Sequence, residues 1–551
     1  MTPVPIIGRD RGLPPGDETE KDTRMQTRRN FLAAGATLAT CYVTPGASAA
    51  PHQTAPVVDL TCGKVRGGWS GVAATPIRQF LGIPYGASTR TTRFMPPAAV
   101  RPWAGAREAI AYGPACPQGS GSEPQSEDCL VLNVWAPPGQ PHAKRPVLVY
   151  IHGGGYSNGS SASPLTHGAN LAARGDVVVI TLNHRLNLFG HFHLAAHAGD
   201  AYATSGNAGL LDLVLALEWV RDNAAAFGGD PANVTLFGQS GGGAKIACLM
   251  AMPSAKGLFH RVWTMSGQQV TVQGPRGATA RARVAMDHIG ASLDTLRAWP
   301  ADRLLAALTA KDPTIAGSRI YWGPVLDAAL PIHPFWPEAP ALSANIPMVM
   351  GNTREETGSL IARGDSSIFD LTWETLPDRL ERDMVSDIGV HAAIALYRKL
   401  YPDLPPAQVF IRATSAGRSW RAQLLEAEAR ARQAAPTFVY QLDYPSRADH
   451  GRLGAYHMLD IPLVFANTHE ASADTGDDAS ARAISATMSD ALLRFARTGD
   501  PNGGGLPAWP HYDLAQRQTM MFDTTTRIDA DPRGEERRFF GRTPYIQPGT
   551  Y

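Results

Sequence analysis

The sequence has almost no net charge. Its 50 lysines and arginines balance 49 aspartates and glutamates, which gives a formal net charge of +1. Without an excess of either sign, no long-range field attracts a nucleic acid or an anionic membrane surface. The partners predicted from this balance are small and largely neutral molecules.

The sequence also lacks long apolar runs, internal repeats and Cys-x-x-Cys pairs. No apolar run reaches the roughly 18 to 20 residues that cross a bilayer, and no metal site is predicted. Hydrophobic residues make up 44% of the 551 residues, which is enough for a large core. Because no repeat or low-complexity linker divides the interior, we predict one large domain over residues 50–551. No motif specifies an oligomeric state.

The first fifty residues differ from the rest of the chain. A polar stretch leads to the peptide TRRNFL at 27–32 and then to a small apolar segment at 33–43, which is typical of a twin-arginine export signal. The short apolar core and the Ala-Ser-Ala at 47–49 favour cleavage over a membrane anchor. We therefore predict a signal over 1–49 and a soluble mature protein, periplasmic or secreted. The alternatives are a chance Arg-Arg ahead of a core helix, or a start at Met25.

Cysteines are scarce, with five in the chain. Cys41 falls within the predicted signal. Cys116 and Cys129 bracket a loop of Gly, Ser, Pro and acidic residues, and a disulfide that closes it would stabilise the fold by roughly 3 kcal/mol. We predict that bridge, which suits an oxidising compartment. Cys62 and Cys248 lie in apolar surroundings and are predicted to be separate buried thiols rather than a pair.

Short apolar segments rich in β-branched residues alternate with helical patterns. Six of them can form buried parallel strands, namely residues 147–151, 177–182, 234–237, 262–265, 347–350 and 438–442. The clearest helix covers 210–223, where an apolar stripe opposes Arg221 and Asp222. This alternation predicts an α/β fold with a central, mostly parallel, twisted sheet and helices on both faces. Helix-rich insertions over about 275–345 and 360–435 are expected to cap a site.

The most informative motif is Gly-Gln-Ser-Gly-Gly at 238–242, which follows the β-type run 233–237 and precedes a helical pattern. The glycines let the chain reverse from strand to helix within two residues, which lifts the Ser240 hydroxyl clear of the sheet. We predict that Ser240 is a nucleophile. Because this motif arises by chance in roughly one chain in five of this length, the interpretation depends on its partners.

A second glycine-rich segment follows another predicted strand. The run 146–151 ends in His-Gly-Gly-Gly-Tyr at 152–156. Consecutive glycines let main-chain N–H groups point at one spot, where they stabilise a developing oxyanion. We predict Gly154, Gly155 and Gly241 as the donors. The alternatives are a tight turn or a phosphate cradle, and the P-loop form is excluded because no Lys-Ser/Thr pair follows.

Several blocks, in the same order, resemble the type B carboxylesterase and cholinesterase family of α/β-hydrolases. The blocks are Phe-Leu-Gly-Ile-Pro-Tyr at 80–85, Glu-Asp-Cys-Leu-Val-Leu-Asn-Val at 127–134 and Gly-Asn-Ala-Gly-Leu-Leu-Asp at 206–212. The stretches 183–187 and 241–245 are similar to bacterial members, so the chain resembles a bacterial secreted carboxylesterase. The resemblance implies the α/β-hydrolase fold over nearly the whole mature chain. Gln239 and Gly241 depart from animal members, which carry Glu and Ala there, and neither change removes a catalytic atom.

The fold implied by this resemblance places an acid and then a histidine after the nucleophile. A loop after the predicted strand at 347–350 is similar to the family's acid loop and assigns the acid to Glu356. Glu355 is the competitor, and a solvated loop carboxylate is the non-functional alternative. His457 is assigned as the histidine, because it precedes an acidic residue, an apolar-Pro step and a phenylalanine, as in the family. Ser266 resembles the family's serine that hydrogen-bonds the acid.

Other histidines after Ser240, and four before it, lack this context. A lone histidine is more often a surface or satisfied core residue than a catalytic one. Structural roles are therefore predicted for His184, His191, His193, His197, His391, His450, His469 and His511. Asp460 is expected to brace the loop that carries His457.

Together these residues predict a serine carboxylesterase that works through an acyl-enzyme and needs no metal or organic cofactor. Neutral His457 would take the proton of Ser240, and Glu356 would orient the imidazole. The alternative from another class is a non-catalytic binding protein, as in the neuroligin-like adhesion members. Amidase, thioesterase and lactonase are alternatives on the same site.

The expected substrate is a small-molecule ester, and choline esters are disfavoured. The loop 116–129 has no Trp, Tyr or Phe, whereas the matching loop of cholinesterases supplies an aromatic ring for the quaternary ammonium. Bacterial relatives act on aryl, p-nitrobenzyl, pyrethroid-type or fumonisin esters, and the walls of the pocket choose among these classes.

Overall fold

The computed structural model describes residues 54–551 except 72, 74, 316, 317, 548 and 551. The predicted export signal therefore lies outside the described residues. In the part of the chain that is described, no helix is long and apolar enough to cross a bilayer.

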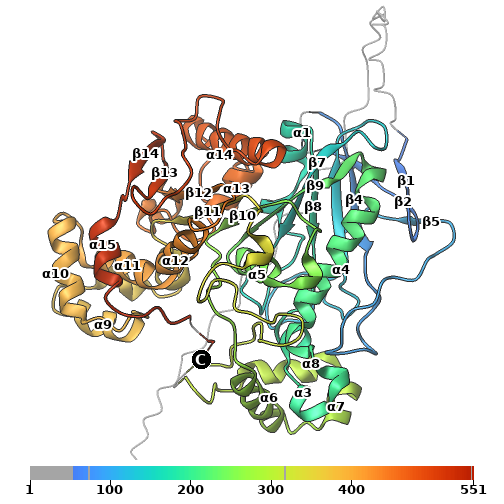
Figure 1. Ribbon diagram of the computed structural model, residues 1–551, viewed down its shortest axis with the longest axis horizontal. Helices are drawn as coiled ribbons and strands as arrows, with labels where there is room; N and C mark the ends of the chain where they lie inside the picture. Colours follow the sequence, from blue (N-terminus) through green and yellow to red (C-terminus); the bar gives the residue numbers. More distant parts are fainter. Residues whose placement is uncertain (1–53, 72, 74, 316–317, 548, 551) are drawn as a thin grey trace, which may run out of the picture. The chain divides into compact units, whose positions relative to one another are not determined.

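An eleven-stranded mixed sheet forms the centre of the fold (Figure 1). In chain order its strands are β3 (Gly68–Ser70), β4 (Ile77–Pro84), β6 (Val131–Ala136), β7 (Arg145–Ile151), β8 (Val178–Leu182), β9 (Gly229–Gln239), β10 (Arg261–Met265), β11 (Met348–Thr353), β12 (Thr437–Leu442), β13 (Gln518–Phe522) and β14 (Arg527–Ala530). A smaller sheet pairs β1 (Val57–Leu60), β2 (Gly63–Arg66) and β5 (Ala106–Glu108).

The spatial order of the large sheet is β14-β13-β12-β11-β10-β9-β7-β8-β6-β4-β3. The strands from β13 through β8 in this order pair in parallel. At the two edges, β14 and the group β6, β4 and β3 pair antiparallel. The prediction of a central, mostly parallel sheet is confirmed.

The six predicted strands correspond to β7–β12. Along β7, Val147 and Val149 join one hydrophobic cluster, whereas Leu148 and Tyr150 join the other. Each of these strands is thus covered on both faces, and such strands read as continuous apolar runs. The six strands could therefore be predicted from continuous apolar runs, without an alternation of apolar and polar residues.

Helices cover both faces of the sheet (Figure 1). They are α1 (Ala169–Gly175), α2 (Asn187–His191), α3 (Ala195–Ala198), α4 (Ala208–Asn223), α5 (Gly241–Ala251), α6 (Pro275–Ile289), α7 (Leu293–Ala298), α8 (Ala301–Leu304), α9 (Leu376–Asp383), α10 (Val390–Leu400), α11 (Pro406–Ser415), α12 (Arg421–Arg430), α13 (Asp460–Phe465), α14 (Ala479–Thr498) and α15 (Gly534–Phe540). Side chains of α4 and α5 pack in the cluster of Val147, and those of α1, α11 and α14 pack in the cluster of Leu148. The predicted layering of helices on both faces is confirmed.

Helix α4 matches the predicted helix over 210–223, but its apolar stripe differs. Arg221 and Asp222 are exposed, as predicted. Leu211 and Leu215, two leucines expected on the apolar stripe, are only half-buried. The helix contacts α2, α5 and β9, so its buried surface is wider than one stripe.

Two insertions leave the sheet on either side of β11. The first holds α6, α7 and α8, and the second holds α9–α12 with two π-helical turns, η8 (Gly358–Ala362) and η10 (Ala416–Trp420). Figure 1 shows α6, α7 and α8 together at the bottom of the view, and α9, α10 and α11 together at its left. In the described residues, the α-helices of the first insertion lie in its first half, and its second half carries the short 3-10 turn η7 (Ala341–Ser343). Prolines recur through residues 310–345, and they remove the N–H groups that a helix requires.

The predicted disulfide is not formed in this structure and stays a prediction. Cys116 and Cys129 are buried free thiols, and contact with Cys116 together with burial raises the pKa of the Cys129 thiol. Main-chain pairing closes the loop, because Ala115 forms a parallel bridge with Gln125. This pairing orders the loop without a covalent link.

Several other predictions concern isolated buried residues. Cys62 and Cys248 are separate, buried, free thiols, as predicted. His184 and His191 are buried in the fold, and burial lowers the pKa of both imidazoles. His193 is also buried. These positions agree with structural roles.

Candidate active site

Ser240 lies at a strained turn between β9 and α5. Its backbone has φ 56° and ψ −128°, a conformation that non-glycine residues adopt rarely and mainly at functional sites. The Ser240 N–H donates to the carbonyl of Met265 at 2.8 Å, which ties the turn to the end of β10. The strand, sharp turn and helix form the nucleophile elbow that the sequence motif predicts.

The glycines after Ser240 are required by close packing. A Cβ on Gly242 would lie 1.9 Å from the carbonyl oxygen of Ile151, at the end of β7. A Cβ on Gly241 would lie 2.1 Å from the carbonyl oxygen of Gly155. The predicted oxyanion loop therefore packs directly against the start of α5.

Glu356 and His457 form a hydrogen-bonded pair in which Nδ1 of His457 donates to Oε2 of Glu356. The other oxygen, Oε1, accepts from Ser266 Oγ at 2.6 Å, Asn352 Nδ2 at 3.0 Å and Thr353 N at 2.9 Å. Burial by itself would raise the pKa of Glu356, but the imidazole and these donors lower the pKa below its usual value. The carboxylate is therefore ionised and fully saturated with donors.

Nε2 of His457 faces Gln239 in this structure. The side-chain nitrogen of Gln239 lies 3.2 Å from Nε2. Because Nδ1 carries the proton given to Glu356, Nε2 is free to accept this amide hydrogen. Among the described residues no hydrogen bond joins Ser240 to His457, although both line one cavity. Catalytic hydrogen bonds often tighten only when a substrate binds.

Two neighbouring carboxylates have other partners. Glu355, the competitor for the acid, pairs with Arg412 at 3.0 Å and accepts from Ala455 N at 3.0 Å. Asp460 accepts from the Tyr440 hydroxyl at 2.9 Å, and burial raises the pKa of Asp460 to about 6. Asp460 thus ties the segment after His457 to β12, as expected of a bracing residue.

The glycine loop is held from within the core by Lys245 of α5. Its side chain is fully buried, and Nζ donates to the carbonyl oxygens of Gly155 at 2.7 Å and His152 at 3.3 Å. Burial lowers the pKa of Lys245 to about 7. Gly155 and Gly241 line the cavity, and Gly154 precedes them with φ 84°. The two hydrogen bonds fix the peptide planes on either side of the predicted donors.

Sequence reasoning noted Lys245 only as part of a stretch similar to bacterial members. A lysine inside an otherwise apolar helix is the signal that could have marked it, because an unpaired buried lysine is rare. Its partners could not be foreseen, since they are main-chain carbonyls about 90 residues earlier.

Replacing Lys245 by methionine is expected to lower kcat for a p-nitrophenyl ester by about 10- to 100-fold, because a loosened loop misplaces the oxyanion donors. KM should change little, since Lys245 does not line the cavity. Steady-state kinetics with a thermal melt checks this, and Lys256→Met, at an exposed position, is the control. A large rise in KM with unchanged kcat would refute the positioning role.

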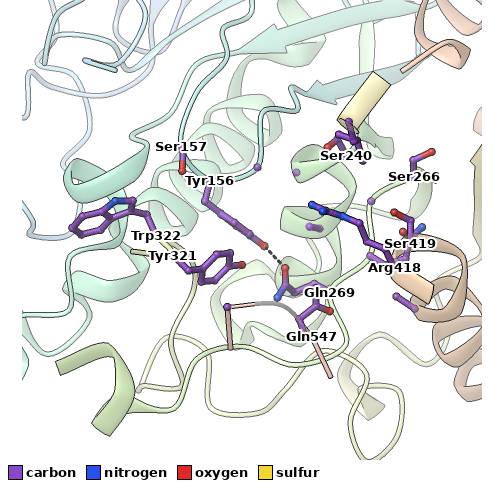
Figure 2. A pocket seen from close by; sticks show the side chains of 18 of the residues that line it. Tyr156, Ser157, Ser240, Ser266, Gln269, Tyr321, Trp322, Arg418, Ser419 and Gln547 are labelled. Carbon is purple, nitrogen blue, oxygen red and sulfur yellow. Dashed lines mark hydrogen bonds between the residues drawn. The ribbon is translucent and has the colours of Figure 1, made fainter. Parts of the chain in front are cut away.

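Ser240 and His457 both line a cavity of about 420 Å³ (Figure 2). The sheet ends contribute Ser240, Gly241 and His457 to its lining. Both insertions contribute to the walls, as expected: the first with Tyr321 and Trp322, the second with Leu360, Arg418 and Ser419. Figure 2 shows Tyr156, Tyr321 and Trp322 on one side and Arg418 and Ser419 on the other.

A fully buried carboxylate, Glu426 of α12, lies next to this cavity. Its Oε1 accepts from the N–H of Gln269 at 2.7 Å, and Gln269 lines the cavity. Its Oε2 has no hydrogen-bond partner among the described residues. Burial raises the pKa of Glu426 to about 8, so the group is a neutral acid at pH 7. No sequence motif marks this residue.

The raised pKa of Glu426 predicts a pH-dependent cost to stability. From its ordinary value of 4.5 up to about 8, the folded state holds a proton that the unfolded state has released, so the free energy of unfolding falls as pH rises. Glu426→Gln removes this fall. The variant should match the parent near pH 5 and exceed it at pH 9 by at most about 5 kcal/mol.

Thermal melts of Glu426→Gln and the parent between pH 5 and 9 measure this difference. Glu381→Gln, at an exposed position on α9, should show no such trend. A melting-temperature difference that is constant across the pH range would contradict the assignment of a buried neutral acid.

Among the described residues, no group of three or more His, Cys, Asp and Glu side chains could hold a metal ion. The cavity is lined instead by a hydroxyl, an imidazole and glycine main chain, and a carboxylate is hydrogen-bonded to the imidazole from behind. Together with the sheet and its elbow, they define the α/β-hydrolase class.

The chain belongs to the carboxylesterase family, whose model matches residues 54–540. It is 35% identical to the para-nitrobenzyl esterase of Bacillus subtilis over 509 residues, which cover 88% of this chain and 98% of that protein. It is 33% identical to the phenmedipham hydrolase of Pseudarthrobacter oxydans over 83% of this chain and 93% of that protein.

A solved carboxylesterase of Geobacillus stearothermophilus has the same fold, with a TM-score of 0.77 and 37% identity over 88% of this chain and 99% of that one. The family and the fold predicted from the sequence blocks are therefore confirmed. The protein is a carboxylic ester hydrolase.

Proposed function

We propose that the protein is an exported serine carboxylesterase in which Ser240 is the nucleophile, His457 the general base and Glu356 the orienting acid. The observation that carries this proposal is the Glu356–His457 hydrogen bond beside a cavity that Ser240 also lines. The strained backbone of Ser240 adds support, because such strain persists where function requires it.

The proposed reaction begins when Nε2 of His457 takes the proton of Ser240 as Oγ attacks the ester carbonyl. The lone pair on Nε2 is available, because the ring proton is on Nδ1 and is donated to Glu356. The imidazolium then gives its proton to the departing alcohol, and water repeats the cycle on the acyl-serine. The ionised Glu356 stabilises the imidazolium in both halves.

For this proton transfer, His457 must exchange its Gln239 partner for Ser240. The Gln239 amide lies where it can donate to the lone pair of Nε2, which is the atom that the reaction requires as the base. Rotation of the imidazole would redirect Nε2. Gln239, next to Ser240 in sequence, thus serves as a temporary donor to the base.

The carbonyl oxygen becomes anionic during the attack, and the N–H groups of Gly154, Gly155 and Gly241 are proposed to bind it. Each such donor is typically worth about 3 kcal/mol of barrier. The two hydrogen bonds from Lys245 to the glycine loop support this role, because they fix the loop before the reaction starts.

A small-molecule ester is the proposed substrate. The names of the similar proteins refer to p-nitrobenzyl esters and phenmedipham, and the aromatic wall of Tyr156, Tyr321 and Trp322 suits an aryl group.

Export to the periplasm or the medium is proposed from the twin-arginine motif within residues 1–49. Replacing both Arg28 and Arg29 by lysine should then retain esterase activity in the cytoplasmic fraction.

The proposed function is tested with the purified chain from residue 50 onward and p-nitrophenyl acetate and butyrate. We expect turnover of both esters, and its loss in proportion to labelling by a serine-directed phosphonate. Failure to hydrolyse either ester would refute the proposal. Turnover that survives complete phosphonate labelling would refute the serine mechanism.

A further inference from the structure

We propose that the cavity selects esters that also carry a free, ionised carboxylate, and that Arg418 binds this carboxylate. The inference rests on the proposed function, because it names the substrate class of the same site. Its observations are independent of the catalytic residues. They concern an arginine without a partner, the turn that presents it, and the charges around it.

Arg418 extends into the cavity without a partner of its own. Figure 2 shows its side chain reaching from η10 toward the space below Ser240. In the part of the chain that the structure describes, Arg418 forms neither an ion pair nor a hydrogen bond. Two arginines of the adjoining helices differ: Arg412 of α11 pairs with Glu355, and Arg430 of α12 donates to main-chain carbonyls.

A π-helical turn presents Arg418 to the cavity. In η10, which joins α11 to α12, Gly417 and Trp420 are buried whereas Arg418 is exposed. Single π-turns between helical segments occur frequently at functional sites. Ser419, in the same turn, also lines the cavity, and its hydroxyl can donate a second hydrogen bond to a carboxylate.

The charged side chains of the cavity wall are positive. No aspartate or glutamate is among the described residues that line it. Arg319 of the first insertion lines it as well and, within the described chain, has no ion pair. The buried Glu426 behind Gln269 is a neutral acid at pH 7, because burial raises its pKa to about 8, so it does not neutralise Arg418.

These features match an anionic substrate. A guanidinium binds a carboxylate through charge-assisted, often bidentate, hydrogen bonds. The opposite wall of Tyr156, Tyr321 and Trp322 accepts an apolar or aryl group. A quaternary ammonium would meet two unpaired arginines, so the structure gives a second reason against choline esters.

Two pairs of esters test the inference and locate the carboxylate. Mono-4-nitrophenyl glutarate, with the carboxylate on the acyl side, is compared with its methyl ester. 4-Butyryloxybenzoate, with the carboxylate on the alcohol side, is compared with its methyl ester. At low ionic strength, we expect the anionic member of at least one pair to have the higher kcat/KM, by about 10-fold or more.

In the ester pair that shows the anionic preference, Arg418→Gln should lower kcat/KM for the anionic ester by about 10- to 100-fold. It should lower kcat/KM for the neutral methyl ester by less than about 3-fold. Arg418→Lys should recover part of the loss, because it keeps the charge without the planar fork. Arg382→Gln, at an exposed position on α9, is the matched control and should leave both rates unchanged.

A preference for the neutral member in both pairs, or equal losses on both members in Arg418→Gln, would overturn the inference. Hydrolysis of p-nitrophenyl butyrate reports separately on the proposed function. If p-nitrophenyl butyrate is not hydrolysed, the carboxylate site is tested instead by the change in melting temperature of the protein when glutarate is added. A rise that disappears in Arg418→Gln supports the carboxylate site, and no rise in the parent protein refutes it.

Discussion

Replacing Ser240 by alanine is expected to lower kcat for p-nitrophenyl butyrate by about 10⁶. The acyl-enzyme cannot form without Oγ, and the oxyanion donors and the cavity alone leave a small residual rate. The fold should persist, because Ser240 contributes its backbone, not its side chain, to the turn. The measurement is kcat from steady-state kinetics, with a melt to show folding.

Ser254→Ala, at an exposed position after α5, is the matched control and should keep full activity. Because residual activity near 10⁻⁶ is easily exceeded by a contaminating esterase, the phosphonate label should be applied to the variant as well. A folded Ser240→Ala protein that retains more than about a tenth of the parent rate would contradict the assigned nucleophile.

Replacing Glu356 by glutamine is expected to lower kcat by about 10⁴. The shape is conserved, but the glutamine amide can donate to Nδ1 of His457. The ring proton then moves to Nε2, and the imidazole can no longer accept the proton of Ser240. The loss should persist at high pH, because it comes from the wrong tautomer and not from a titration.

Glu355→Gln discriminates between the two adjacent acids. It weakens a buried pair with Arg412, so it should lower the melting temperature more than it lowers kcat. Kinetics and melts of the two variants, run side by side, give the comparison. A larger fall in kcat for Glu355→Gln than for Glu356→Gln would reverse the assignment.

The central strands could be predicted from the sequence because each is buried on both faces. β7 is apolar and buried from its second residue to its end, and β9 is buried through its second half. Such buried runs are the plainest sequence signal for a strand. The edge strands β3 and β14 are short and partly exposed, so no run marks them. The second half of the first insertion is irregular, whereas the whole insertion was predicted to be helix-rich. Its recurring prolines interrupt helices.

The residues of the candidate site were named from motifs that are local in sequence. Ser240 stands in a strand, turn and helix pattern, and Glu356 and His457 stand in blocks similar to the family. Contacts between distant segments carry no such mark. Gln239 contacts His457 across 218 residues, and Glu426 receives a hydrogen bond from Gln269 across 157.

The loop between Cys116 and Cys129 shows the same limit of local sequence signals. Loop length and composition gave a favourable entropy for closing the segment between Cys116 and Cys129, but they say nothing of main-chain pairing. In the structure, Ala115 and Gln125 close the same loop through their backbones. Local composition could therefore identify the loop but not the interaction that closes it.

Mass spectrometry of the purified protein after brief reaction with p-nitrophenyl butyrate and acid quenching tests the central claim most directly. The account predicts a butyryl group on the peptide that carries Ser240, present in the parent chain and missing from Ser240→Ala. An ester-hydrolysing protein with its acyl group on any other residue, or with none under conditions that trap it, would contradict the account.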